Sequence, residues 1–128
     1  MVINQVSPRK EARCMIETFR FGEIVIRGAT YRDDVKILAD GSIVHPWWRG
    51  AGHRVEPGDV QDLLRDEPHL LVLGMGQPGQ MRASSALSAE LERLGIRLVE
   101  KPTSQAAEEI NTALRGGERV CAGLHLTC

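Results

Sequence analysis

In several short segments between residues 15 and 45 the apolar positions recur at every second residue. In 23–27, for example, Ile24 and Ile26 share one face of a segment that has charged residues at both ends. A spacing of two is typical of β-strands, whose side chains point alternately to opposite faces. The pattern predicts strands over 15–21, 23–27, 34–38 and 42–45. The last two are predicted to form a hairpin, because Asp40-Gly41 between them readily supplies the positive φ of a tight turn.

After residue 57 the apolar spacing changes to three and four, which is typical of helices that bury one face. Val60, Leu63 and Leu64 follow this spacing within a helix predicted over 59–66. Longer helices are predicted over 85–94 and 104–115, with Thr103 as the N-cap of the second. Apolar segments between them predict strands over 70–73, 96–99 and 120–126. This βαβαβ order indicates an α/β fold with right-handed crossovers and a sheet that is buried on both faces.

Composition agrees with one folded unit. The chain has 128 residues, of which 42% are hydrophobic and 26% charged, close to the average for globular proteins. Residues 1–13 are polar and show no apolar period, so we expect a loose N-terminal leader there. A single domain is predicted over 14–128.

Charge and hydrophobicity exclude several classes of protein. Sixteen Lys and Arg against seventeen Asp and Glu leave a net charge of -1, so the basic surface of a nucleic-acid binder is missing. The longest apolar run, 70–73, is too short to span a bilayer, and the first ten residues contain no apolar export segment. We therefore expect a cytoplasmic protein. Its three cysteines show no Cys-x-x-Cys spacing and are expected to be reduced thiols.

A glycine-rich segment follows the strand predicted over 70–73. Gly74, Gly76 and Gly79 match G-x-G-x-x-G, and Glu100 lies 21 residues beyond the last glycine, as in dinucleotide-binding folds. Pro78 removes a backbone donor, however, the next helix begins only near residue 84 or 85, and too little chain remains for a second nucleotide-binding half. The pattern favours a tight turn with close backbone packing, and amides near the helix start could hold a small anion.

Both tryptophans of the chain lie in one glycine-rich connection, over 46–53. In extended backbone Trp47 and Trp48 face opposite ways, so one can anchor the core while the other lines a groove. Arg49 then offers a forked donor to a carboxylate or phosphate, with His53 close behind. The alternative is that both tryptophans simply close the core and Arg49 is half-solvated.

The C-terminal strand contains two cysteines and a histidine, which raises the question of thiol catalysis. In a strand His125 and Cys128 point to opposite faces. Cys121 and His125 share a face but lie about 13 Å apart, too far for the hydrogen bond that a nucleophile and its base require. We predict no catalytic residue.

Metal and acid–base chemistry have little support elsewhere in the chain. His45, His53 and His125 match no known metal-ligand spacing, so we expect neither a metal nor another cofactor. Asp33 and Asp34 are adjacent, and adjacent strand residues diverge. Turn and capping roles explain this acidic pair more simply than acid–base work.

Several segments over about residues 15–128 form a recognisable combination: Phe21-Gly22, Tyr31 to Asp34, Trp47-Trp48-Arg49, His53, Asp59, Gly74 to Gly76, Thr103, Ala106, Asn111, Arg119-Val120 and His125 to Cys128. In this combination the chain resembles the Mth-type domain family, whose relatives include the adipogenesis-associated Mth domain-containing protein of animals and mitochondrial complex I assembly factor 3. The resemblance implies a three-layer fold with a mixed central sheet, helices on both faces and a β-rich N-terminal part. It implies no enzymatic activity, although the mitochondrial relatives act in respiratory-complex assembly. This chain shows no recognisable mitochondrial presequence.

Two functions remain open at this point. The first is a non-catalytic binding or assembly-factor-like module, and the second is a small enzyme or ligand-dependent switch that binds a small anionic molecule. The expected partner is a protein or a small anion, and the chain is expected to be a monomer or a weak homodimer. The candidate ligand-binding residues are Trp48, Arg49, His53, Gly74, Gly76 and His125.

Overall fold

The computed structural model describes residues 16–128, and the leader predicted over 1–13 lies outside them. A central sheet has the strand order β5-β4-β10-β7-β9. Strands β10, β7 and β9 are parallel, β4 is antiparallel to β10, and β5 is antiparallel to β4. Their bounds are β4 Val35–Ile37, β5 Ile43–Val44, β7 Leu70–Gly74, β9 Arg97–Lys101 and β10 Val120–Leu124. The predicted α/β class with a mixed, mostly parallel sheet is confirmed.

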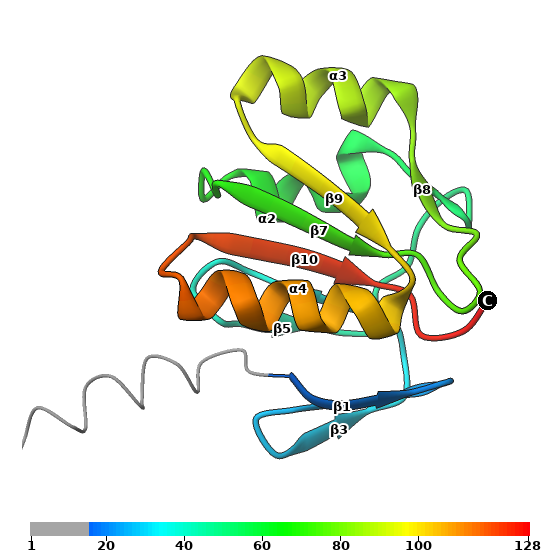
Figure 1. Cartoon of the computed structure of the whole chain (residues 1–128). Coiled ribbons are helices and arrows are strands. Elements are labelled where there is room, and N and C mark those ends of the chain that lie inside the picture. Colours follow the sequence, from blue (N-terminus) through cyan, green and yellow to red (C-terminus); the bar gives the residue numbers. More distant parts are fainter. Residues whose placement is uncertain (1–15) are drawn as a thin grey trace, which may run out of the picture.

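Two helices connect the parallel strands in the predicted βαβαβ order (Figure 1). Helix α3 (Ser85–Leu94) leads from β7 to its neighbour β9, and α4 (Thr103–Arg115) leads from β9 back past β7 to β10. The direction of the crossovers therefore reverses at β9, an edge strand of the sheet. In open α/β sheets, ligands bind outside the carboxyl ends of the strands.

The core has two parts, one on each face of the sheet. Helix α4 packs on one face, while α3 and the short helix α2 (Gln61–Leu64), preceded by the 3-10 turn η1 (Pro57–Val60), cover the other. Strand β10 shows the alternation plainly, because Ala122 and Leu124 belong to the first core and Cys121 to the second. Helices thus lie on both faces of the sheet, as the resemblance implies.

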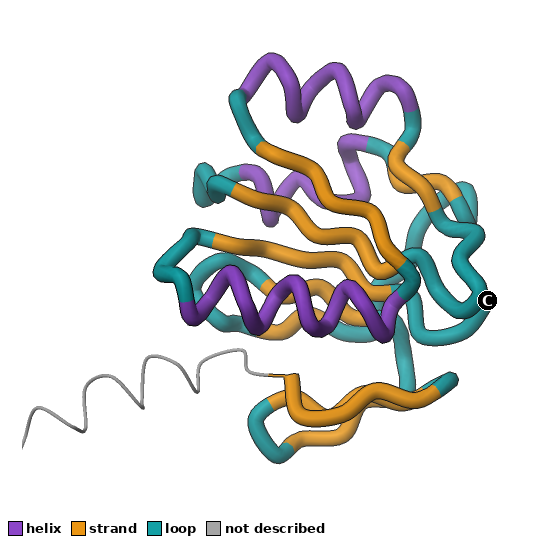
Figure 2. Tube along the Cα trace, in the orientation of Figure 1, coloured by secondary structure: helices purple, strands orange, loops and turns teal. Residues whose placement is uncertain are grey.

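The N-terminal part is an antiparallel three-stranded sheet that packs against α4 (Figure 2). It consists of β1 (Ile16–Arg20), β2 (Glu23–Ile26) and β3 (Ala29–Tyr31). The side-chain amide of Asn111 on α4 donates to the carbonyl of Ile16 (2.9 Å), and its oxygen accepts from the Ile16 amide (3.0 Å). Ile24 and Ile26 are fully buried, as their alternate spacing predicts.

The hairpin predicted around Asp40-Gly41 is confirmed. Strands β4 and β5 pair with Ile37 opposite Ile43, and Gly41 has a φ of 97°. The pattern did not reveal β3 or the two-residue parallel pair of β6 (Arg54–Val55) with β8 (Arg82–Ala83). Segments this short contain too few residues for a period to show.

Two predictions about local structure are wrong. Thr103 is not the N-cap of α4, since Pro102 occupies that position and Thr103 is the first helical residue, fully buried. Its hydroxyl instead donates to the carbonyl of His125 (2.6 Å) and accepts from the amide of Gly76 (2.9 Å). Strand β10 also ends at Leu124 rather than at 126, because the backbone leaves the sheet to make the contacts of the candidate site.

The indole of Trp47 lies against the backbone of Gly123 in β10. Trp47 is only 4% exposed, and its Nε1 donates to the carbonyl of Asp59 (3.0 Å). A Cβ at Gly123 would lie 2.6 Å from the indole ring. The sheet therefore admits Trp47 only because position 123 has no side chain.

We expect Gly123→Ala to destabilise the fold by about 1–3 kcal/mol, because the added methyl overpacks a filled core. Urea denaturation of the variant and the wild type measures the difference in the free energy of unfolding. Gly58→Ala is the matched control, since nothing lies within 4 Å of a Cβ there. Equal stability of Gly123→Ala and Gly58→Ala would contradict the packing described for Trp47.

Candidate functional site

A largely buried carboxylate, that of Asp34, joins three separate segments at the carboxyl end of β10. Its Oδ2 accepts from Nη2 of Arg49 (2.9 Å) and from Nδ1 of His125 (2.8 Å). Its Oδ1 accepts from the backbone amide of Leu126 (2.8 Å). The side chain immediately before β4 therefore holds both the tryptophan-containing connection and the C-terminal segment in place.

The guanidinium of Arg49 is held on three sides. Besides Asp34, it donates from Nε to the carbonyl of Gly52 (2.6 Å), and its Cζ lies 4.5 Å from the centroid of the Trp47 ring. The side chain is 6% exposed, so the alternative in which Arg49 is half-solvated is wrong. Its Nη1 is buried and has no hydrogen-bond partner among the described residues. A guanidinium in this state keeps unused donor capacity.

The ring of His125 has a defined orientation. Its Nδ1 lies 2.8 Å from a carboxylate oxygen of Asp34, so Nδ1 carries a proton and donates to it. Nη2 of Arg49 lies 3.4 Å from Nδ1, which is the spacing of two donors that share one acceptor. Nε2, on the other side of the ring, is buried and has no partner within 16–128. The backbone of His125 is fixed too, because its amide donates to the carbonyl of Gly74 (3.0 Å).

A pocket of about 350 Å³ opens over this cluster. Trp48 forms part of its wall and is 81% exposed, whereas Trp47 is buried. The prediction that one tryptophan anchors the core and the other lines a groove is thus confirmed. His53 is exposed, and its ring centroid lies 5.4 Å from that of His125 in an edge-on arrangement. The pocket is lined by Arg32, Asp33, Asp34, Pro46, Trp47, Trp48, Arg49, Gly52, His125, Leu126 and Thr127.

The glycine-rich turn after β7 packs closely against the C-terminal segment and the His125 ring. Gly76 has a φ of 98°, and a Cβ there would meet the carbonyl of Thr127 and lie 2.8 Å from the His125 ring. A Cβ at Gly74 would lie 2.8 Å from Leu124 and 2.9 Å from the hydroxyl of Thr103. The turn is therefore built for close packing, and both glycines contact His125, Gly74 through its carbonyl and Gly76 beside the ring.

The contacts of this turn differ from those of a dinucleotide site. The carboxylate of Glu100 accepts from the amide of Ala83 (2.7 Å), where a cofactor-binding fold would hold a ribose. Helix α3 begins at Ser85, six residues after Gly79, and the Ser84 hydroxyl caps it by accepting from the amide of Leu87 (3.0 Å). The literal G-x-G-x-x-G match is a structural turn.

Asp34 is the residue that sequence reasoning missed. A turn or capping role predicted for it is wrong, because its carboxylate binds side chains 15 and 91 positions away in the chain. Burial by itself raises the pKa of Asp34, but hydrogen bonds from His125 and Leu126, the His125 charge and the hydrogen bond from Arg49 together hold this pKa below its ordinary value of 3.8. The sequence contained two signals, a carboxylate directly before an apolar strand and the place of Asp34 in the Tyr31 to Asp34 segment of the family resemblance.

Thiol catalysis at Cys121 has no support in the structure. Burial, followed by the nearby carboxylates of Asp62 and Asp66, raises the pKa of the Cys121 thiol to about 12. The thiolate is the nucleophilic form, so this sulfur stays protonated and unreactive at neutral pH. Cys121 belongs to the core on the α3 side of the sheet.

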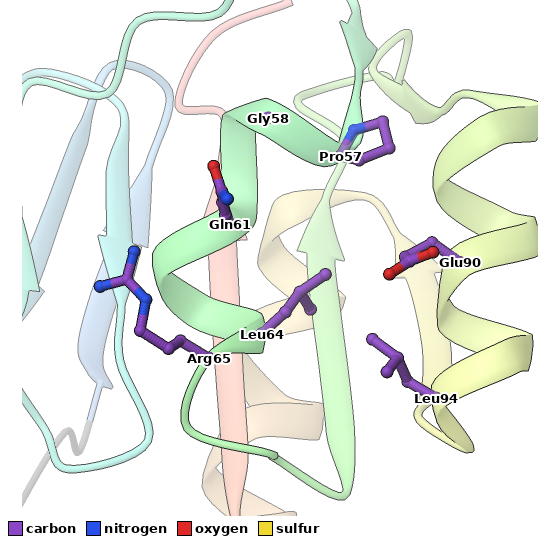
Figure 3. A pocket seen from close by; sticks show the side chains of 7 residues that line it. All are labelled: Pro57, Gly58, Gln61, Leu64, Arg65, Glu90 and Leu94. Carbon is purple, nitrogen blue, oxygen red and sulfur yellow. The ribbon is translucent and has the colours of Figure 1, made fainter.

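A second hollow, of about 430 Å³, lies between α2 and α3 and contains none of the predicted site residues (Figure 3). Leu64 of α2 and Leu94 of α3 point toward one another across it. Its acidic residue, Glu90, is paired with Arg93 on the same helix (2.6 Å). Within residues 16–128, the buried side-chain atoms that have no partner belong to Arg49 and His125, so we place the site at the Asp34 cluster.

Comparison with known proteins identifies the family. Residues 16–125 match the family model described as protein of unknown function (DUF498/DUF598). The chain belongs to this family. The structure is similar to that of MT938, with 26% sequence identity and a TM-score of 0.74 over 89% of this chain and 98% of that one. A Bordetella pertussis protein described as a Mth938-like domain shares the fold with 16% identity and a TM-score of 0.72 over 90% and 87% of the two chains. The resemblance to the Mth-type domain family is confirmed.

The comparisons leave the location of the protein as a prediction. Among residues 16–128 no helix is both long and apolar enough to cross a membrane. A similar structure from Bartonella henselae, with 19% identity and a TM-score of 0.77 over 91% and 97% of the two chains, is described as an outer membrane protein. At this identity the likeness shows the fold alone.

We expect Asp34→Asn to lower the free energy of unfolding by about 3–5 kcal/mol at pH 7, because it removes one partner of a largely buried ion pair. The pKa of Asp34 is lower in the folded protein than in the unfolded chain. Its stabilising contribution is therefore present above pH 3.8 and is lost as the pH falls through the folded-state pKa. As the pH falls, the free energy of unfolding of the wild type should therefore approach that of Asp34→Asn. Urea denaturation of both proteins at several pH values measures this change.

Asp33→Asn is the matched control for that experiment. It removes the same charge from the adjacent residue, whose side chain is exposed. We expect its stability to stay within about 0.5 kcal/mol of the wild type at every pH. Equal losses in the two variants would contradict the central role of Asp34.

Proposed function

We propose that the protein is a non-catalytic binding module whose pocket over Asp34 takes a carboxylate or phosphate group. The observation that carries this proposal is the Nη1 of Arg49, which has no partner among the described residues. A buried donor without an acceptor costs about 1–3 kcal/mol. An anionic oxygen in the pocket removes that cost and forms a charge-assisted hydrogen bond.

The geometry of Arg49 favours recognition over a purely structural role. Asp34, Gly52 and the Trp47 ring already fix the guanidinium, so it loses little conformational freedom when a ligand binds. Arginine pairs with carboxylates and phosphates through two parallel hydrogen bonds. The site is therefore preorganised for a small, planar or tetrahedral anionic group.

Trp48 supplies the second part of the proposed recognition. It is a large exposed aromatic side chain at the pocket wall, and its neighbour Trp47 holds the connection rigidly in the core. Exposed aromatic rings on a fixed backbone are frequent anchors in binding sites. An anionic ligand with a flat apolar body would place its charge at Arg49 and its body against the indole.

The anionic group can belong to a small molecule or to a partner protein. Mth-type relatives that the resemblance links to respiratory-complex assembly are consistent with a module that acts by binding. An assembly-factor-like role for this chain is part of the proposal, and so are its cytoplasmic location and its state as a monomer or weak homodimer.

Benzoate is a suitable probe, because it combines a carboxylate with a flat ring. Both tryptophans of the chain lie at the site, so their fluorescence reports on binding. We expect Trp48→Ala to weaken benzoate binding by roughly 2- to 10-fold, which corresponds to the loss of one aromatic contact worth about 0.5–1.5 kcal/mol. Trp47 remains as the reporter in the variant.

The melting temperature separates binding from stability in this test. Because Trp48 is 81% exposed, its removal is expected to leave thermal unfolding unchanged. The control is Leu94→Ala, which truncates an exposed side chain on α3 beside the other hollow. This variant is expected to bind benzoate as the wild type does. Absence of benzoate binding to the wild type, or equal binding by Trp48→Ala, contradicts the proposed site.

A further inference from the structure

The cluster below the pocket has a balanced charge as long as the His125 imidazole is neutral. Asp34 contributes one negative charge and Arg49 one positive charge, and His125 adds a positive charge only when it is protonated. An anionic ligand bound to Arg49 would leave the cluster with an unbalanced negative charge. Removing such a charge from water is costly unless an opposite charge accompanies it.

His125 can supply that charge while it keeps its contact with Asp34. Imidazole is the side chain that changes its charge between pH 5 and 8. Its Nδ1 already donates to Asp34, so the imidazolium form keeps this contact and gains a charge-assisted hydrogen bond. The added proton therefore goes to Nε2, the ring nitrogen that has no partner in the described part of the chain.

Binding of the ligand and uptake of the proton each make the other more favourable. Without a ligand, a protonated Nε2 of His125 would be a buried donor with no acceptor, which is unfavourable. Without the proton, the lone pair of Nε2 would face the oxygen of a ligand and repel it. With both present, the Nε2–H donates to the anionic oxygen, and the two binding events favour each other.

We infer that the pocket binds a carboxylic acid as its anion together with one proton, which is taken up by Nε2 of His125. This inference rests on the proposed function and specifies its ligand class and pH dependence. The proton passes from solvent to the imidazole, no bond within the ligand changes, and Asp34 stays ionised opposite the new imidazolium.

Other charged groups around His125 do not take over this role. His53 is exposed and stacks edge-on against His125 outside the cluster. Asp33 and Arg32 at the pocket wall carry opposite charges, and Arg32 is already paired with Glu23 (3.3 Å). The turn that touches the His125 ring from below does so with Gly76, which has no charge.

Calorimetric titration with benzoate measures the proton directly. At a pH of about 7.2 the binding enthalpy is determined in bis-Tris and in Tris, two amine buffers with different heats of ionisation. Benzoate remains ionised at this pH, since carboxylic acids titrate near pH ~4, so any proton that is absorbed goes to the protein. We expect a net uptake approaching one proton per bound benzoate. The dissociation constant should correspondingly fall by up to about 10-fold for each pH unit between pH 8 and pH 7.

Three histidine variants locate the proton. His125→Gln retains an amide that can form hydrogen bonds but cannot titrate, so we expect weaker benzoate binding without proton uptake. His69→Gln, at the opposite end of the parallel strands, is the matched control and should behave as the wild type. The inference would be overturned if His125→Gln still took up a proton on binding benzoate and His53→Gln did not. The two-buffer measurement on the wild type decides the question of uptake even if His125→Gln does not fold.

The outcomes distinguish this inference from the proposed function. Binding of benzoate to the wild type without proton uptake overturns the inference alone, whereas no binding at any pH overturns both. A short peptide with a C-terminal phenylalanine carboxylate, compared with its amide, identifies the source of the acid. If the peptide with the free carboxylate binds more tightly than benzoate, a partner protein is the favoured source of the acid. If it binds more weakly, a small acid is favoured. In either case, proton uptake with the tighter of the two ligands supports the inference.

Discussion

The hydrogen bonds of the Asp34 carboxylate hold together parts of the protein that the chain itself does not connect. A carboxylate removed from water must be compensated by donors, and here they come from Arg49 in the tryptophan-containing connection and from His125 and Leu126 after β10. The donors lie 15, 91 and 92 residues from Asp34 in sequence, so these contacts depend on the tertiary fold. The same interaction therefore closes the end of the sheet and builds the floor of the pocket.

Strand β10 is the element on which this arrangement is built. Gly123 lets the Trp47 indole pack directly against β10, and the Arg49 guanidinium lies over that ring. Immediately beyond the strand, the carbonyl of His125 accepts from the buried hydroxyl of Thr103 at the start of α4. The site thus rests on a central strand and on a helix terminus, which are rigid supports for residues that must keep a fixed geometry.

Two nitrogen atoms in this cluster, Nη1 of Arg49 and Nε2 of His125, are buried without a hydrogen-bond partner among residues 16–128. Native proteins satisfy nearly all buried polar groups, so such exceptions require an explanation. Both atoms lie in one cluster at the carboxyl end of the parallel strand β10, and α/β sheets bind ligands outside the carboxyl ends of their strands. Leaving these two buried atoms without partners lowers the stability of the folded protein, as expected at a site where a ligand completes the hydrogen bonds.

The sequence by itself determined the architecture. Periods of two and of three to four place the main strands and the helices within a few residues of their observed bounds, because these patterns reflect local geometry that every strand and helix obeys. The same reasoning separated Trp47 from Trp48 and singled out Arg49 and His125. Only the tertiary structure decided the role of Asp34, the burial of Thr103 and the early end of β10. Each of these depends on contacts between residues far apart in sequence, and a local pattern carries no information about such contacts.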